Sequence, residues 1–462
     1  MSPPDSPTPE HPSYRRVWAV AWPIILANST VPLLGLVDTA VIGRTGRTVD
    51  LGAIALGALI FNFVYWSFGF LRMGTTGFAA QADGAGDEAE VRATLGRALL
   101  LATGIGLTLI LLQGPVFGAV FKLLGASADV ESITQSYVLI RIWGAPASLA
   151  LFALLGMLIG LGHSRKLLQL QLLLNSLNIL LDVYFAGILG WGAPGIALGT
   201  VIAEWAALIY GGYTTYRALD CRRQASEAFW TWKGVVNGEK LQRTLSANAD
   251  ILIRTLLLLF GFAWFTDQSA RLGNAVLAGN YILLQFISFS AFFLDGFAFG
   301  TESWAGRAAG AGQRALFDHA IRTSTVLAAA AAIMLSLTIV LLGPYAIAGV
   351  TNLADVRETA ERFLPYAALY VLVSFAAFQL DGIFIGTTRT RAMRDAAVLA
   401  MLVFLVASWP LVRWAGNHGL WTAFVIFILA RAVALGTRYQ ALRASITRHR
   451  SASGRDRKHD GW

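Results

Sequence analysis

The chain is divided into long apolar blocks, and this feature limits its fold more than any other. Each block is about 20–33 residues long and ends at a short polar break, which is enough for a helix to cross a hydrocarbon core of roughly 30 Å. Because a membrane-spanning segment must satisfy its own backbone hydrogen bonds, we predict α-helices. Charged residues make up only 14% of the chain, whereas an ordinary soluble domain has about a quarter.

Twelve such blocks predict an all-α protein with twelve transmembrane helices. They cover residues 17–43, 51–80, 94–119, 134–161, 166–188, 193–218, 245–266, 272–304, 320–342, 359–387, 393–413 and 417–440. The longest polar stretch between blocks, 219–244, falls near the middle of the chain and predicts a linker between two halves. The expected organisation is a tail at 1–16, a first lobe at 17–218, the linker at 219–244, a second lobe at 245–440 and a tail at 441–462.

The formal net charge of +9 indicates an orientation in the bilayer rather than a nucleic-acid partner. Basic residues gather in the even-numbered connections, including Arg222 and Arg223 of the linker, and in the C-terminal tail. Fewer lie in the odd-numbered connections. Because cytosolic loops are enriched in Lys and Arg, we place both termini in the cytosol, with the protein in the cell (inner) membrane. The only cysteine, Cys221, cannot form an internal disulfide.

The two halves resemble each other at an offset of 226 residues. Gly156-Met157-Leu158-Ile159-Gly160 corresponds at that offset to Gly382-Ile383-Phe384-Ile385-Gly386, and other short matches keep the same order along the chain. Repeats with an even number of helices enter the membrane in the same orientation, so we expect two six-helix lobes related by a pseudo-twofold axis along the membrane normal. The paired glycines also allow close helix packing.

Carboxylates inside apolar blocks are the candidate functional groups of the first half, since a charge at mid-bilayer is costly. Asp38 follows Pro32 by six residues, and Pro32 is expected to kink the first helix and act as a hinge. Asn178 and Asp182 are four residues apart and therefore share one helix face. Together they can hold a proton or bind a small cation such as Na⁺; the alternative is a polar packing seam.

The second half has polar candidates of its own: Arg254, Asp295, Gln379 and Asp381. Arg254 is expected to pair either with Asp250, four residues before it, or with one of these acids. The chain has no P-loop, catalytic triad or metal-site spacing, so we predict no enzymatic activity, no cofactor other than a coupling ion, and transport driven by an ion gradient.

Several segments resemble the MATE (multidrug and toxic compound extrusion) family, in particular its branch named for the DNA-damage-inducible protein F. They are Val37-Asp38-Thr39-Ala40-Val41-Ile42-Gly43, Asn178-Ile179-Leu180-Leu181-Asp182, Ile253-Arg254-Thr255, Phe293-Leu294-Asp295-Gly296-Phe297-Ala298 and Gln379-Leu380-Asp381-Gly382-Ile383-Phe384-Ile385-Gly386-Thr387. The resemblance covers about residues 15–440. It implies two six-helix lobes and an antiporter that expels organic compounds in exchange for H⁺ or Na⁺.

The resemblance also implies roles for particular residues. Asp38, Asn178, Asp182 and Thr200 match the positions of a proton or Na⁺ site in the first lobe. Arg254, Asp295, Gln379 and Asp381 remain possible contacts to substrate in the second. A pair of Glu residues that another branch carries on the seventh helix is missing here.

The expected partners are a small organic substrate and the lipid bilayer, and we expect a monomer. The substrate is predicted to be a cationic or amphipathic compound of the multidrug type. Two alternatives stay open: export of an organic anion such as citrate, which a cavity-facing arginine would favour, and flipping of a lipid-linked precursor.

Overall fold

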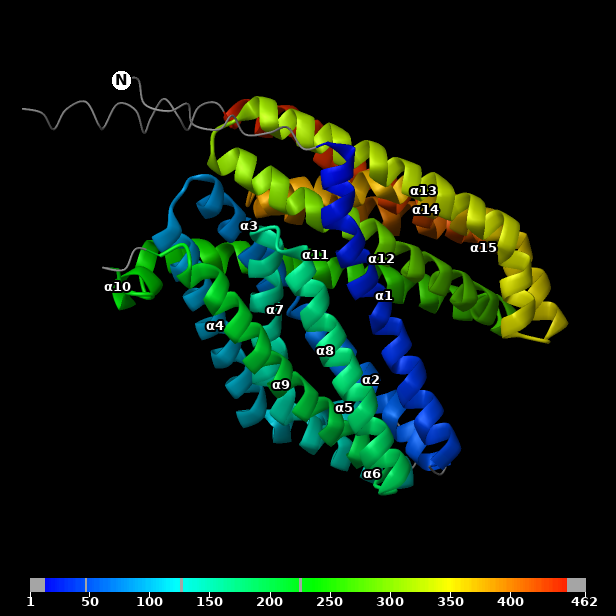
Figure 1. The fold of residues 1–462 in the computed structure, drawn as a ribbon. Coiled ribbons are helices and arrows are strands. Elements are labelled where there is room, and N and C mark those ends of the chain that lie inside the picture. The colour runs from blue at the N-terminus through cyan, green and yellow to red at the C-terminus, as the bar shows by residue number, and fades with distance from the viewer. Residues whose placement is uncertain (1–12, 46–47, 125–127, 224–226, 447–462) are drawn as a thin grey trace, which may run out of the picture. The chain divides into compact units, whose positions relative to one another are not determined.

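The computed structural model describes residues 13–45, 48–124, 128–223 and 227–446, which contain helices and no β-strand. The helices are α1 (Tyr14–Thr45), α2 (Thr48–Ser67), α3 (Phe70–Gly84), α4 (Glu88–Leu111), α5 (Gln113–Leu124), α6 (Ala128–Arg141), η1 (Ile142–Gly144), α7 (Ala145–Gly160), α8 (Ser164–Asp182), η2 (Val183–Ile188), α9 (Gly192–Asp220), α10 (Trp232–Val235), α11 (Gly238–Arg271), α12 (Asn274–Gly310), α13 (Arg314–Val350), α14 (Ala354–Gly386) and α15 (Thr390–Ser445). The all-α prediction is confirmed, and Figure 1 shows the course of these helices.

Ten helical segments in the described part of the chain are long and apolar enough to cross a membrane. The last of them, α15, consists of two helices joined at Gly416, whose φ of 56° and ψ of −128° are not helical. The predicted number of twelve spans is therefore not established by these ten segments alone. These segments do establish that the chain is a multi-pass membrane protein.

The repeat predicted from the sequence recurs in the contacts between helices. A Cβ placed on Gly156 in α7 would lie 2.4 Å from the backbone oxygen of Arg72 in α3. A Cβ on Gly382 in α14 would lie 2.5 Å from the backbone oxygen of Ala298 in α12. The 226 residues that separate the two glycines also separate Arg72 from Ala298, so equivalent helices make equivalent backbone contacts in each half. Only glycine permits approaches this close.

The same offset relates the ends of helices. α8 begins at Ser164 and α15 begins at Thr390, 226 residues later. Gly190, in the turn between η2 and α9, has a φ of 69°, and Gly416 lies 226 residues after it with a φ of 56°. The two parts of α15 thus correspond to α8 and α9, which supports the interpretation of α15 as two spans.

The chain forms two compact units. One contains the described parts of Met1–Ile25, Ala80–Gly86 and Ser246–Trp462, and the other contains Leu26–Ala79 and the described parts of Asp87–Leu245. The first has an aromatic core in which Phe265, Trp421 and Phe424 are completely buried. In the second, Phe61 and Tyr137 pack edge to face with their ring centroids 6.4 Å apart. The exact boundaries predicted for the lobes and the linker stay predictions.

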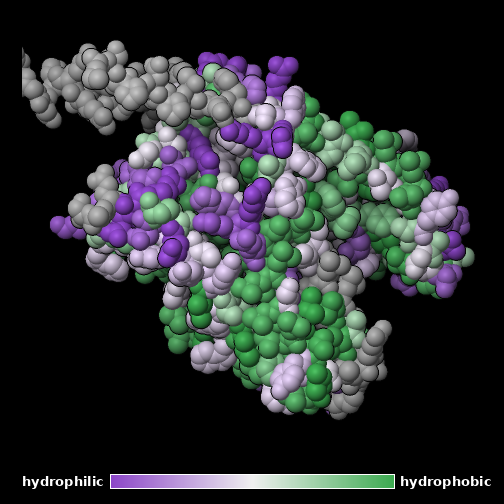
Figure 2. Space-filling model, viewed as in Figure 1, coloured by the Kyte–Doolittle hydropathy of each residue, from purple (hydrophilic) through white to green (hydrophobic). Residues whose placement is uncertain are grey.

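The described residues of the predicted linker pack against the start of α4. Arg97 in α4 donates a hydrogen bond to the backbone oxygen of Gly234 in α10, and Lys240 in α11 forms an ion pair of 2.6 Å with Glu90. Figure 2 shows hydrophilic residues gathered around α10 and the start of α4, and apolar residues over the visible faces of α6 and α9. This separation agrees with a linker in water and helices in lipid.

Candidate ion-coupling site

The candidate site of the first half lies at the end of α8. Asn178 and Asp182 face the same side of this helix and are 1% and 0% exposed. Asp182 is the last α-helical residue, because the chain continues as the π-helix η2. Short π-helical segments inside longer helices are frequent at functional sites. The change of helix type directly after Asp182 therefore marks the place where an acid is held inside the apolar protein.

Helix α9 lies beside α8 (Figure 1) and supplies the other wall of this site. The Asn178 amide nitrogen donates a hydrogen bond of 3.1 Å to Thr200 Oγ1, which in turn donates to the backbone oxygen of Ile196. A Cβ placed on Gly199 would lie only 2.5 Å from Asp182 Oδ1. The structure thus brings Asn178, Asp182 and Thr200 together. Their role as ion ligands stays a prediction.

Helix α1 runs along α8 and contacts it at Asn175, three residues before Asn178. The Asn175 amide nitrogen donates a hydrogen bond to Thr30 Oγ1, and a Cβ placed on Gly187 would lie 3.9 Å from Val41 Cγ1. These two contacts show that α1 and α8 run in the same direction. The turn of α1 that carries Asp38 is therefore level with the α8 turn that carries Asp182.

The side chains of Pro32 and Asp38 lie outside the described part of the structure. Their backbone belongs to α1, which continues as a helix through both positions. The kink expected at Pro32 and the approach of the Asp38 carboxylate to the α8 site accordingly stay predictions.

The atoms available to bind an ion at this site are oxygens, which suit a proton or a hard cation such as Na⁺. Asn178 Oδ1 is buried and has no hydrogen-bond partner among the described residues. A buried polar atom without a partner is costly, and such an atom calls for an explanation such as a bound ion or water. With Thr200 Oγ1 and the Asp182 carboxylate nearby, this oxygen fits an ion site.

The second half contains a buried cluster of two arginines and one aspartate. Arg254 in α11 and Arg431 in α15 both donate hydrogen bonds to Oδ2 of Asp381 in α14, the Arg431 bond being 3.0 Å long. All three residues are 6% exposed. Of the two pairings expected for Arg254, the structure thus shows the one with Asp381. Asp250 instead receives a hydrogen bond of 2.7 Å from Arg394.

Gln379 in α14 belongs to a separate hydrogen-bond network. Gln379 Oε1 accepts a hydrogen bond of 2.8 Å from Thr301, and Thr301 lies 2.6 Å from Ser324. This buried network links α14, α12 and α13. Asp295 in α12 is partly buried. The predicted role of Gln379 and Asp295 in substrate contact stays a prediction.

The buried arginines that were not predicted from the sequence include Arg431, described above, and Arg141. Arg141 forms a two-pronged ion pair with Glu204 through hydrogen bonds of 2.8 and 2.6 Å. Its guanidinium group also lies 5.2 Å from the ring centroid of Phe61 and 5.3 Å from that of Tyr65. Each partner comes from a different helix, so the spacing along the chain contained no signal for either pairing.

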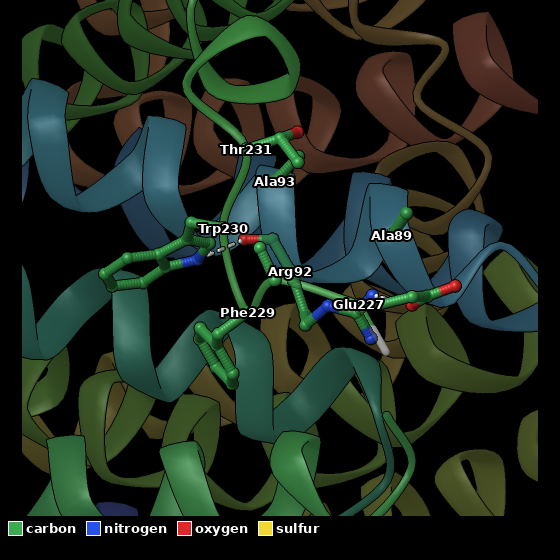
Figure 3. Close-up of a pocket in the computed structure, with 8 residues that line it drawn as sticks. Ala89, Arg92, Ala93, Glu227, Phe229, Trp230 and Thr231 are labelled. Atoms are coloured by element: carbon green, nitrogen blue, oxygen red, sulfur yellow. Dashed lines mark hydrogen bonds and ion pairs between the residues drawn. The ribbon is translucent and has the colours of Figure 1, made fainter. Parts of the chain in front are cut away.

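A pocket of about 290 Å³ lies away from these groups, where the linker meets α4. Figure 3 shows Arg92 Nη2 bonded to Glu227 and the Trp230 indole donating to the Arg92 backbone oxygen. The wall of the pocket combines these residues with Phe229, Thr231 and three alanines. None of the predicted ion or substrate residues lines it, so this pocket is a feature of the linker.

Comparison with known proteins identifies the family. The family model MatE matches residues 23–184 and 251–409. The chain is 38% identical to the DNA damage-inducible protein F of Escherichia coli (strain K12) over 424 residues, 92% of this chain and 91% of that protein. It is 27% identical to a probable multidrug resistance protein NorM of Agrobacterium fabrum over 91% of this chain and 92% of the relative.

Solved structures share the fold at lower identity. A crystal structure of MATE in the straight conformation superposes with a TM-score of 0.84 at 17% identity and covers 96% of this chain and 98% of its own. The bent conformation gives a TM-score of 0.82 at 18% identity, with 96% and 97% covered. These likenesses confirm the two-lobe helical fold. Taken with the family model and the relatives, they show that the chain belongs to the MATE family of membrane transporters.

Proposed function

We propose that the protein is a secondary active antiporter that exports organic compounds in exchange for H⁺ or Na⁺. The observation that carries this proposal is the buried oxygen cluster at the end of α8. There, Asn178 Oδ1 lacks a hydrogen-bond partner among the described residues and the Asp182 carboxylate is completely buried. A carboxylate kept inside a membrane protein is functional by default, because its burial is costly. In this proposal the proton or Na⁺ that moves down its gradient binds to this cluster.

In the proposed cycle Asp38 and Asp182 take up the ion, with Asn178 and Thr200 as neutral ligands. A proton or Na⁺ reduces the negative charge of the cluster and so changes which arrangement of α1 and α8 is favoured. Because an ion shifts an equilibrium only by its difference in affinity for the two states, the ligands must be closer together in one state than in the other. Pro32 lies six residues before Asp38 and is the proposed hinge for this change.

The proposal is tested by Asp38→Asn, which preserves size and removes the titratable charge. Export driven by an imposed pH or Na⁺ gradient should be abolished in membrane vesicles, while the amount of inserted protein stays the same. Asp267→Asn is the matched control, because Asp267 is an exposed acid of α11 paired with Arg271. Undiminished export by Asp38→Asn would exclude the mechanism.

For the substrate we propose a cationic or amphipathic organic compound, supported by the relatives named as probable multidrug resistance proteins. Export of an organic anion is the second candidate. The observation that favours it is the pair of buried arginines, Arg254 and Arg431, on one carboxylate oxygen. We further propose that the protein works as a monomer in the inner membrane, with both termini in the cytosol.

A further inference from the structure

The pocket beside the linker contains a buried arginine whose hydrogen bonding is incomplete. Arg92 lies near the start of α4, is 2% exposed and lines the pocket. Its Nη2 donates a hydrogen bond of 2.6 Å to Glu227 Oε2. Its Nε and Nη1 are buried and have no hydrogen-bond partner in the described part of the chain. Because buried donors without an acceptor are costly, this arginine calls for an acceptor from outside the protein.

The carboxylate that does contact Arg92 is only loosely held. The side chain of Glu227 is 45% exposed, and within the described ranges only its Oε2 accepts a hydrogen bond. The ion pair of Arg141 and Glu204 is different, because both oxygens of that buried carboxylate are engaged. An ion pair with an exposed partner contributes little to stability. Glu227 can therefore turn aside and admit another acceptor at small cost.

The charges in the wall of the pocket are balanced. Among the lining residues that the structure describes, Arg92 and Glu227 are the charged ones, one of each sign. A ligand with one negative and one positive group matches this pair better than a simple anion. Trp230 adds a surface for the positive group, since the face of an indole ring attracts ammonium ions. Its Nε1 donates a hydrogen bond of 3.0 Å to the backbone oxygen of Arg92, which holds the ring beside the arginine (Figure 3).

The pocket lies at the end of a helix that can cross the membrane, because the first turns of α4 form part of its wall. Leu100 and Leu107 follow Ala93 by seven and fourteen residues, so the three lie on one stripe of α4. Both leucines are exposed. Trp232, which follows the pocket residues along the linker, is exposed as well, and tryptophan is enriched at the level of lipid headgroups. An apolar surface thus leads from the pocket toward the lipid chains.

From these features we propose that the pocket binds the headgroup of a zwitterionic phospholipid of the adjoining leaflet. Glu227 turns aside, and Arg92 donates to the phosphate group, which arginine binds well through parallel hydrogen bonds. Glu227 and the ring of Trp230 hold the ammonium group. The volume of about 290 Å³ is at the lower limit of the roughly 300–1,000 Å³ typical of pockets for drug-sized ligands, and it suits a small headgroup. This inference does not depend on the proposed ion coupling.

The experiment measures binding of single lipid molecules to the full-length protein in detergent micelles by native mass spectrometry. The probes are short-chain phosphatidylethanolamine, phosphatidylcholine and phosphatidylglycerol, the last of which has a phosphate but no ammonium group. At least one of the two zwitterionic lipids should bind about tenfold more tightly than phosphatidylglycerol. Soluble phosphoethanolamine should bind more weakly than that lipid, because it has no acyl chains to lie on α4.

Two variants assign the binding to this pocket. Arg92→Gln should weaken binding of the preferred lipid about tenfold, because the phosphate loses its charged donor. Glu227→Gln should remove the preference over phosphatidylglycerol, because the ammonium group loses its carboxylate. Lys233→Gln is the matched control: Lys233 is an exposed cation of the same linker that does not line the pocket, and its replacement should change neither the affinity nor the preference.

The proposal is overturned if phosphatidylglycerol binds at least as tightly as both zwitterionic lipids, or if soluble phosphoethanolamine binds as tightly as the preferred lipid. It is also overturned if Lys233→Gln weakens binding as much as Arg92→Gln does, since the effect would then be one of surface charge. Should Arg92→Gln fail to fold, Glu227→Gln decides the matter alone, because its side chain is half exposed. An unchanged lipid preference in Glu227→Gln contradicts the assignment.

Discussion

Gly199 in α9 lies directly against the carboxylate of Asp182 in α8, so that a Cβ on Gly199 would be 2.5 Å from Asp182 Oδ1. Real Cβ atoms do not approach an oxygen so closely, and the backbone of α9 therefore forms one wall of the acid's surroundings. The next residue, Thr200, accepts the hydrogen bond of Asn178. One turn of α9 thus positions both polar residues of α8.

Gly199→Ala should impair ion coupling by moving the Asp182 carboxylate. Because neighbours that orient a ligand affect ion affinity strongly, we expect coupled export to fall on the order of tenfold, with normal insertion. Gly212→Ala on the same helix is the control, since a Cβ there meets no atom within 4 Å. Export and expression are measured side by side in vesicles; equal export by both variants would contradict the role of this wall.

Thr200→Val removes the hydroxyl group that accepts from Asn178 while keeping the shape of the side chain. It leaves the buried Asn178 amide nitrogen without its acceptor, which should raise the ion concentration needed for half-maximal export, on the order of tenfold. Thr214→Val is the matched change, because Thr214 donates only to the backbone oxygen of Gly211. The ion dependence of export distinguishes the two, and identical curves would argue against Thr200 as a ligand.

Glu204→Gln tests the buried ion pair with Arg141. Removing one partner leaves an uncompensated buried charge, so we expect the free energy of unfolding to fall by about 3 kcal/mol. The exposed pair of Asp267 and Arg271 is the control. Asp267→Asn should change the free energy of unfolding by less than about 1 kcal/mol. Denaturant unfolding in detergent measures both, and a loss below 1 kcal/mol for Glu204→Gln would show that the pair is not essential to stability.

Cys221 gives a test of orientation that needs no substitution. It is the only cysteine of the chain and is exposed at the end of α9. A membrane-impermeant maleimide should label it in inside-out vesicles and not in intact cells. In a Cys221→Ser background, Trp414→Cys should show the reverse pattern, because Trp414 is 88% exposed and lies on the predicted outer side. Labelling of Cys221 from outside the cell would overturn the predicted topology.

Sequence patterns predicted the fold well because its main determinants are local. Apolar blocks indicate spans, and the offset between Gly156 and Gly382 indicates the duplication, which the contacts to Arg72 and Ala298 confirm. The same offset places Phe404 and Ser408 where the first half has Asn178 and Asp182. The polar cluster of α8 therefore has no direct counterpart in the second half.

The ion pairs could not be predicted in the same way. Arg431 meets Asp381 across 50 residues, and Arg141 meets Glu204 across 63. Spacing along the chain identifies neighbours only on one helix, so pairings between helices need the packed structure. Thr200 was expected only from the family resemblance, because its own helix shows no feature that points toward Asn178.

The central claim is that the acids of the first half couple ion entry to export. It is tested most directly in inside-out vesicles with an acidic lumen, by recording the pH of the lumen when substrate is added, with and without Na⁺. The account predicts that substrate makes the lumen more alkaline in the wild type, or that substrate uptake requires luminal Na⁺, and that Asp182→Asn abolishes whichever response is present. Substrate uptake that is independent of both ions, or unchanged in Asp182→Asn, would contradict it.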